Sequence, residues 1–150
     1  LNLDNWKTSV ADHRDLPVKK NHVDLVISGW SVCYLNDKES EKWQKPFLKG
    51  LKAFRRILTP GGKLILLETE GTGYSQPHPP TSMHNYLSLL REEGFQWNWI
   101  HTDYLFASWQ EVHELVPFFF GDEMIDKCED TVDGIVLPEC TGIWWKQVKD

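Results

Sequence analysis

The sequence has few cysteines, no excess of positive charge and no long hydrophobic run, and each of these features excludes a class of protein. Cys33, Cys128 and Cys140 are too few and too scattered for a disulfide framework or a zinc site, and we interpret them as small buried hydrophobic residues. The 16 Lys and Arg residues against 22 Asp and Glu residues give a net charge of −6, which argues against nucleic-acid binding. No apolar stretch approaches the roughly 20 residues that span a bilayer, so no membrane association is expected.

A signal peptide is also not expected, because Asp4, Lys7 and Asp12 interrupt any apolar segment near the N-terminus. An odd number of cysteines without such a signal predicts a reducing, cytoplasmic location. No two histidines have metal-ligand spacing with a third ligand, so no metal is expected. A length of 150 residues with an even composition predicts a single domain over residues 1–150, which is long enough to bury a core.

Strand patterns and helix patterns alternate along the chain. The runs from His22 to Gly29 and from Lys63 to Thr69 are almost continuously apolar, which is typical of strands buried on both faces of a parallel sheet. Further strands are predicted from Phe95 to Phe106 and from Gly134 to Lys146, the latter interrupted near Pro138. Parallel strands joined by right-handed crossovers are the usual result of this alternation, so the fold class is α/β.

The predicted helices are bounded by residues that cap or stop helices. A first helix begins at a capping box opened by Asn36 and ends at the Pro-Gly-Gly turn of residues 60–62, with a kink or restart at Pro46. Residue 81 or 82 caps a second helix, which Gly94 ends.

A helical insertion over about residues 108–130 follows the third strand, and Ser108 with Glu111 forms its capping box. The aromatic run Phe118–Phe120 in this insertion fits either core packing or the wall of a substrate pocket.

Three segments near the predicted strand ends carry a family resemblance: Ala11–Pro17, Val23–Ser28 and Arg56–Leu64. At this spacing, the chain resembles the later part of a class I S-adenosylmethionine-dependent methyltransferase. The resemblance implies a truncated Rossmann-like sheet, made of the later strands and helices and ending in an antiparallel strand pair. It implies S-adenosylmethionine as the cofactor, and transfer of its methyl group to a small-molecule acceptor by in-line displacement.

The chain departs from this family in one respect. The glycine-rich loop after the first strand of the family and the acidic residue at the end of the second strand are both absent, so we expect a C-terminal portion of the methyltransferase domain. Gly71-Thr72-Gly73 lacks the third glycine of a nucleotide loop, and we interpret it as a substrate-side loop. An alternative function is that of a truncated, non-catalytic interaction module.

The strand order of the family, 3-2-1-4-5-7-6, would leave Val23–Gly29 at the edge of the sheet in this chain. An apolar edge strand is a site that proteins avoid exposing. The edge position of Val23–Gly29 therefore favours either a longer natural protein or self-association through this strand.

The resemblance places cofactor-binding residues in two segments. The Asp12 carboxylate, the favoured cofactor candidate, would accept a hydrogen bond from the adenine amino group, with an Asp in a polar turn as the alternative. Gly29 would permit close backbone approach, and Trp30 or Tyr34 could face the sulfonium, with core packing as the alternative for Trp30. The cofactor-side candidates are Asp12, His13, Ser28, Gly29, Trp30 and Tyr34.

Substrate-side candidates follow the second predicted strand. Glu68 and Glu70 are two residues apart, so they share one strand face and could orient a substrate or act as a general base; solvated charges at a strand end are the alternative. A histidine is a plausible proton acceptor near neutral pH, although each one here also fits an exposed or structural role. No catalytic residue is assigned. The substrate-side candidates are Glu68, Glu70, Tyr74, His78, His84 and Tyr86.

Overall fold

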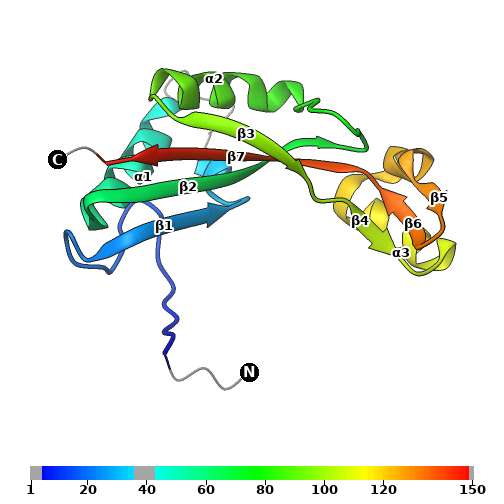
Figure 1. Ribbon diagram of the computed structural model, residues 1–150, viewed down its shortest axis with the longest axis horizontal. Coiled ribbons are helices and arrows are strands. Elements are labelled where there is room, and N and C mark those ends of the chain that lie inside the picture. The colour runs from blue at the N-terminus through cyan, green and yellow to red at the C-terminus, as the bar shows by residue number, and fades with distance from the viewer. Residues whose placement is uncertain (1–4, 36–42, 149–150) are drawn as a thin grey trace. The chain divides into compact units, whose positions relative to one another are not determined.

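The computed structural model of the chain describes residues 5–35 and 43–148 (Figure 1). The chain divides into two compact units. The described residues of the first unit lie within Leu1–Ile27, Ser31–Leu64 and Gln147–Asp150, and those of the second lie within Ser28–Trp30 and Ile65–Lys146.

A four-stranded sheet has the strand order β1-β2-β7-β3, formed by Val23–Gly29, Leu58–Thr72, Glu139–Gln147 and Gln96–His101. This order equals the last four positions of the expected 3-2-1-4-5-7-6 sheet. The predicted α/β, Rossmann-like fold class is therefore confirmed, and β1 is an edge strand, as expected.

Backbone hydrogen bonds give the strand directions. The His22 amide donates to the Ile57 carbonyl and the Trp30 amide donates to the Leu67 carbonyl, both at 2.8 Å, so β1 and β2 advance together and are parallel. β3 pairs with β7 in antiparallel register, with Trp97 opposite Trp144. This pair is the antiparallel strand pair implied by the resemblance.

The prediction that the first strand is buried on both faces is wrong. Leu25 is 49 % exposed and Ile27 is 58 % exposed. In β2, Leu64 and Leu66 are buried, while the intervening Ile65 is half-buried. An apolar run indicates that a strand is adapted to burial on both faces. In β1, the described residues cover only part of these two faces.

Helix α1, Gln44–Ile57, begins just before Pro46, which therefore lies in the first turn, where its missing N–H is not needed. The predicted capping box at Asn36 lies outside the described residues. The helix ends earlier than predicted, because Leu58 is already extended, and the Pro-Gly-Gly sequence at residues 60–62 forms part of β2.

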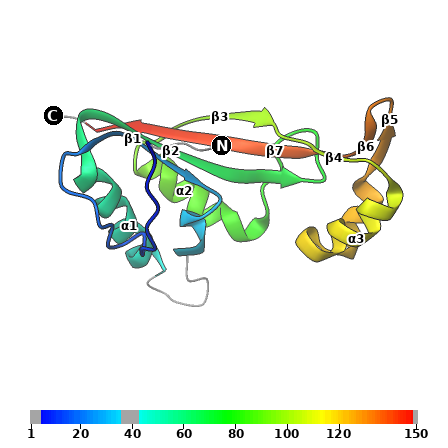
Figure 2. The ribbon, with the colours of Figure 1, turned by 90° about the horizontal axis from the view of Figure 1, so that it is seen from below.

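The second predicted helix is present as a 3-10 turn, η2 (Thr81–Met83), followed by α2 (His84–Glu92). The predicted side-chain cap at residue 81 or 82 is wrong, since neither helix start has a side-chain cap hydrogen bond. Gly94 follows α2 with a positive φ of 78°, as expected of a residue that stops a helix. Figure 2 shows α2 along one face of β3 and β7.

The predicted strand from Phe95 to Phe106 is two strands in different sheets, β3 and β4 (Tyr104–Phe106). Between them, the Asp103 carboxylate accepts a hydrogen bond from the Glu139 amide at 2.9 Å. β4 joins a second sheet of order β4-β6-β5, in which β6 is Gly134–Leu137 and β5 is Glu129–Thr131.

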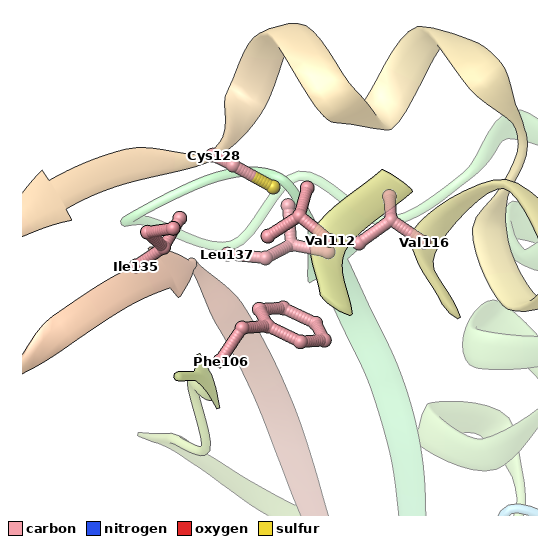
Figure 3. Close-up of a cluster of buried hydrophobic side chains, with 6 residues drawn as sticks. All are labelled: Phe106, Val112, Val116, Cys128, Ile135 and Leu137. Atoms are coloured by element: carbon pink, nitrogen blue, oxygen red, sulfur yellow. The ribbon is translucent and has the colours of Figure 1, made fainter. Parts of the chain in front are cut away.

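The insertion contains α3 (Trp109–Phe120) and the 3-10 helix η3 (Asp122–Lys127). The Ser108 cap is confirmed, because the Glu111 amide donates to Ser108 Oγ at 3.2 Å. A cluster of buried side chains from β4, α3 and β6, together with Cys128, holds the insertion together (Figure 3). The cluster consists of Phe106, Val112, Val116, Cys128, Ile135 and Leu137.

Candidate functional site

Asp12 lies in a tight turn, in which the Asp15 amide donates to the Asp12 carbonyl at 2.9 Å. The Arg14 amide and Nε both donate to Asp12 Oδ1 at 2.8 Å. These hydrogen bonds hold the pKa of the Asp12 carboxyl well below its ordinary value. A lowered pKa favours the ionised carboxylate, which accepts hydrogen bonds and therefore fits both the adenine role and the turn role.

His13 connects this turn to the segment after β1. Its Nε2 lies 3.2 Å from the hydroxyl of Ser31, and its ring meets Phe54 of α1 edge-on at 6.0 Å. Ser31 precedes the 3-10 helix η1 (Val32–Leu35). The sequence analysis missed Ser31, whose only signal was its place beside Trp30. Tyr34, at the other end of this segment, is 84 % exposed.

The end of β1 is strained and open. Trp30 has a positive φ of 45°, a conformation that costs a non-glycine residue about 1–2 kcal/mol, and its side chain is 47 % exposed. The core-packing interpretation of Trp30 is therefore wrong. A Cβ added to Gly29 would meet no described atom within 4 Å, so there is space beside this backbone. Ser28 is buried.

Glu68 and Glu70 do not form a solvated strand end. They are 0 % and 2 % exposed, respectively. The Tyr86 hydroxyl donates to Glu68 Oε1 at 2.7 Å. The indole Nε1 atoms of Trp97 and Trp144 donate to Glu70 Oε1 at 2.9 and 3.0 Å. The structure thus brings three of the six substrate-side candidates, Glu68, Glu70 and Tyr86, into buried hydrogen-bonded networks.

Burial raises the pKa of Glu70, while the two indole donors and the charge of Arg91 act in the opposite direction. The Arg91 guanidinium lies over both indoles, 5.0 Å from the ring centroid of Trp144 and 5.9 Å from that of Trp97. The donors of Glu70 hold both rings in place, so this network positions β3 against β7.

A cavity of about 440 Å³ lies elsewhere in the second unit. It is lined by Thr72, Tyr74, His78, Pro79, Pro80, Thr81, Phe119, Phe120 and Met124. Two substrate-side candidates are among them, Tyr74 and His78, whose rings stack with centroids 4.1 Å apart. His84 lies beside the cavity wall, with its Nε2 3.2 Å from the Pro79 carbonyl.

The insertion supplies the other wall. Phe120 and Met124 line the cavity and also pack against the buried cluster of Figure 3, which fixes their place. Phe119 lines the cavity as well. Phe118 is 80 % exposed and is neither part of the cavity lining nor packed against the cluster. Lys127 Nζ lies over the Tyr74 ring, 5.0 Å from its centroid. The pocket-wall interpretation of the aromatic run therefore holds for two of its three residues.

Glu139 is a buried acid that the sequence analysis missed. It is 2 % exposed, and its Oε1 accepts a hydrogen bond from Thr69 at 2.7 Å. Its Oε2 has no hydrogen-bond partner in the part of the chain that the structure describes. Burial raises the pKa of Glu139 and the charge of Asp103 adds to this, against the hydroxyls of Thr72 and Thr69. Its only sequence signal is an acidic residue directly after the strand break at Pro138.

Among residues 5–35 and 43–148, no cluster of three His, Cys, Asp or Glu side chains is arranged to hold a metal ion. Over the same residues, no helix combines the length and the hydropathy needed to cross a membrane.

Residues 2–66 match the family described as "Methyltransferase domain". A human protein, the mitochondrial arginine-hydroxylase NDUFAF5, is 28 % identical over 131 residues, which cover 75 % of this chain and 35 % of that protein. The chain thus spans about a third of the length of this relative.

Solved structures share the fold. The YcgJ protein of Bacillus subtilis has a TM-score of 0.51 at 10 % identity, over 93 % of this chain and 70 % of that one. A structure from Anaeromyxobacter dehalogenans with a provisional assignment as a type II methyltransferase has a TM-score of 0.50 at 12 % identity, over 99 % and 74 %. These structures show the shared fold, while the match to the methyltransferase domain supports the resemblance over residues 2–66. The matched family implies S-adenosylmethionine as the cofactor.

Proposed function

From the match to the methyltransferase domain, we propose that the full protein transfers a methyl group from S-adenosylmethionine to a small-molecule acceptor. The observation that carries the acceptor side of this proposal is the cavity lined by Tyr74 and His78, which are two residues of the loop expected to face a substrate. A volume of about 440 Å³ is within the range of pockets that hold small molecules.

Each unit, taken by itself, contains groups that fit parts of the cofactor. The ionised Asp12 carboxylate can accept the adenine amino group, next to His13. Gly29 leaves open space beside the backbone, and the exposed rings of Trp30 and Tyr34 offer π faces to a positive charge. The groups that the family uses for the ribose and for close approach to the methionine part are not among the described residues.

When bound, S-adenosylmethionine supplies a methyl group on a positively charged sulfur. The protein's task is then to align the acceptor, and such alignment can lower a barrier by roughly 7–11 kcal/mol. The stacked rings of Tyr74 and His78 would hold one side of the acceptor. If the acceptor atom carries a proton, His78 is the group in the cavity wall suited to accept it. His84 would act on the site through the Pro79 carbonyl.

A second candidate function is that of an interaction module, for which the exposed edge of β1 is the specific observation. Leu25 and Ile27 are each about half exposed on this edge strand, which can pair with another strand, including that of a second copy. Sedimentation tests this candidate: a concentration-dependent dimer supports pairing, and a stable soluble monomer of this chain argues against it.

Calorimetry with S-adenosylhomocysteine tests the enzymatic proposal on both this chain and the full-length gene product. We expect the full-length protein to bind, and Asp12→Ala to weaken binding by about tenfold, since a hydrogen bond to a charged group is lost. Asp15→Ala, in the same turn, is the matched control and should bind like the wild type. Absence of binding by the full-length protein would remove the enzymatic proposal. The human relative is named an arginine hydroxylase, so mass analysis of the product should distinguish an added methyl group from an added oxygen.

A further inference from the structure

The carboxylate of Glu139 is buried, but one of its two oxygens has no hydrogen-bond donor among the described residues. The side chain is 2 % exposed, Thr69 serves one carboxylate oxygen, and the other has no hydrogen-bond partner among the described residues. Buried carboxylate oxygens are almost always satisfied, because taking a charge out of water is costly unless donors replace the water. An oxygen left open in this way indicates a donor from outside the described residues.

Three contacts place Glu139 next to the lining of the cavity. Thr72 lines the cavity, and its hydroxyl also acts on the Glu139 carboxylate. The Tyr104 ring lies tilted against that of Phe120, a residue of the cavity wall, with centroids 4.9 Å apart. Burial and, to a lesser degree, the charge of Glu139 raise the pKa of Tyr104. The residue after Glu139, Cys140, donates from its Sγ to the Tyr74 carbonyl at 3.3 Å. The buried charge and the cavity therefore belong to one neighbourhood.

The cavity wall itself suits a positive charge. Tyr74, His78, Phe119 and Phe120 present aromatic rings, whose faces attract cations. A contact of this kind is already present at the cavity wall, where Lys127 Nζ lies 5.0 Å from the centroid of the Tyr74 ring. The carboxylate of Asp103, hydrogen-bonded to the Glu139 amide, adds a second negative charge nearby.

We propose that the cavity binds a small organic cation, an amine-bearing molecule whose ammonium group is held by Glu139 and Thr72 and whose apolar body packs among the aromatic rings. The Thr72 hydroxyl can donate to the carboxylate while it accepts from the ammonium, so one side chain serves both. In naming the acceptor class, this inference rests on the proposed function; the binding of the cation does not need the cofactor.

Titration calorimetry without cofactor tests the inference, with three probes of similar shape: 2-phenylethylammonium, the neutral 2-phenylethanol and the anionic 3-phenylpropionate. We expect the ammonium to bind about tenfold more tightly than the alcohol, because a buried charge is paired, and the propionate to bind most weakly. Glu139→Gln should reduce ammonium binding to the level of the alcohol and leave alcohol binding unchanged. Glu123→Gln removes the same charge from an exposed position of η3 and should change neither.

Equal binding of ammonium and alcohol, or a Glu139→Gln variant that keeps the preference, would overturn the inference. If Glu139→Gln does not fold by circular dichroism, Thr72→Val gives the same readout, because it removes the shared hydroxyl at nearly constant shape. Since no cofactor is present in these titrations, their failure leaves the binding of S-adenosylhomocysteine untouched. A failure of S-adenosylhomocysteine binding likewise leaves the preference for the cation measurable.

Discussion

Trp97 and Trp144 donate to the same oxygen of Glu70, and this shared acceptor predicts that their loss is not additive. The perturbation is Trp→Phe at each position, alone and together, which removes the indole donor while an aromatic ring remains. After either single change, Glu70 Oε1 keeps one donor. After the double change, a carboxylate that is 2 % exposed has lost both indoles.

The structure sets different magnitudes for the two single variants. Trp144 is fully buried, so Trp144→Phe loses a hydrogen bond to a charged group, about 1.5–3 kcal/mol, together with part of a packed ring, about 1–2 kcal/mol. Trp97 is 38 % exposed, so water can take its place and the expected loss is about 1 kcal/mol. The double variant should lose about 1–2 kcal/mol more than the sum of the two.

Urea denaturation followed by circular dichroism measures the four free energies of unfolding in this cycle. A pH series adds a check, because burial raises the pKa of Glu70. The unfolding free energy is then highest below the ordinary pKa of the group and falls as the pH rises towards the raised value. Loss of both donors should raise this pKa further, so the extra loss should shrink in acid. A coupling within about 0.5 kcal/mol of zero at neutral pH would refute the shared acceptor.

Three further predictions follow from other contacts. Burial raises the pKa of Glu139, so stability should fall as the pH rises from the ordinary pKa of a glutamate; Glu139→Gln should flatten this dependence in urea titrations, and an unchanged slope would contradict it. Leu137→Ala, at a fully buried position of the cluster in Figure 3, should cost about 2–5 kcal/mol, measured against the exposed control Leu105→Ala. Ser108→Ala should cost about 1 kcal/mol in thermal unfolding and Ser108→Gly clearly less, since Oγ accepts from the Glu111 amide; equal losses for the two would show that the cap bond is not the cause.

Local signals in the sequence predicted the elements whose partners are also local. The cap at Ser108 involves a residue three positions away, and the strand break at Pro138 follows from the missing N–H of proline. The break between β3 and β4 could not be predicted in this way. It depends on Asp103, whose carboxylate accepts a hydrogen bond from the Glu139 amide, 36 positions further along the chain. The pattern of apolar residues in 95–106 carries no information about this contact.

The prediction that β1 is buried on both faces failed for a different reason. Its apolar run is typical of a strand covered on both faces, yet Leu25 and Ile27 are about half exposed. Sequence patterns indicate the surroundings to which a strand is adapted, whereas the structure shows the surroundings that the described residues provide. The strand order explains the difference, because β1 lies at the edge of the four-stranded sheet.

The sequence predicted the candidate site only where the residues that form it are close together along the chain. Tyr74 and His78 belong to one Gly- and Pro-rich loop, so their common role was visible in the sequence, and they line the cavity. Phe119 and Met124 reach the same cavity from a distant segment, the insertion, which the sequence left as a separate observation. Glu139 could not be found at all, since its burial depends on contacts such as Thr69, 70 positions away.

Glu68, Glu70 and Glu139 are buried to the same degree, so the donors around them decide which one is suited to receive a ligand. Both indoles that reach Glu70 come from the chain itself, and Arg91 lies against them, so the charge of Glu70 is balanced by the fold. Glu70, one of the two acids at the end of β2 that the sequence favoured, is therefore engaged in packing. At Glu139, one oxygen has a threonine and the other has no partner within the described residues. At Glu139, the cost of burial leaves room for a further donor, and this carboxylate lies next to residues that line the aromatic cavity.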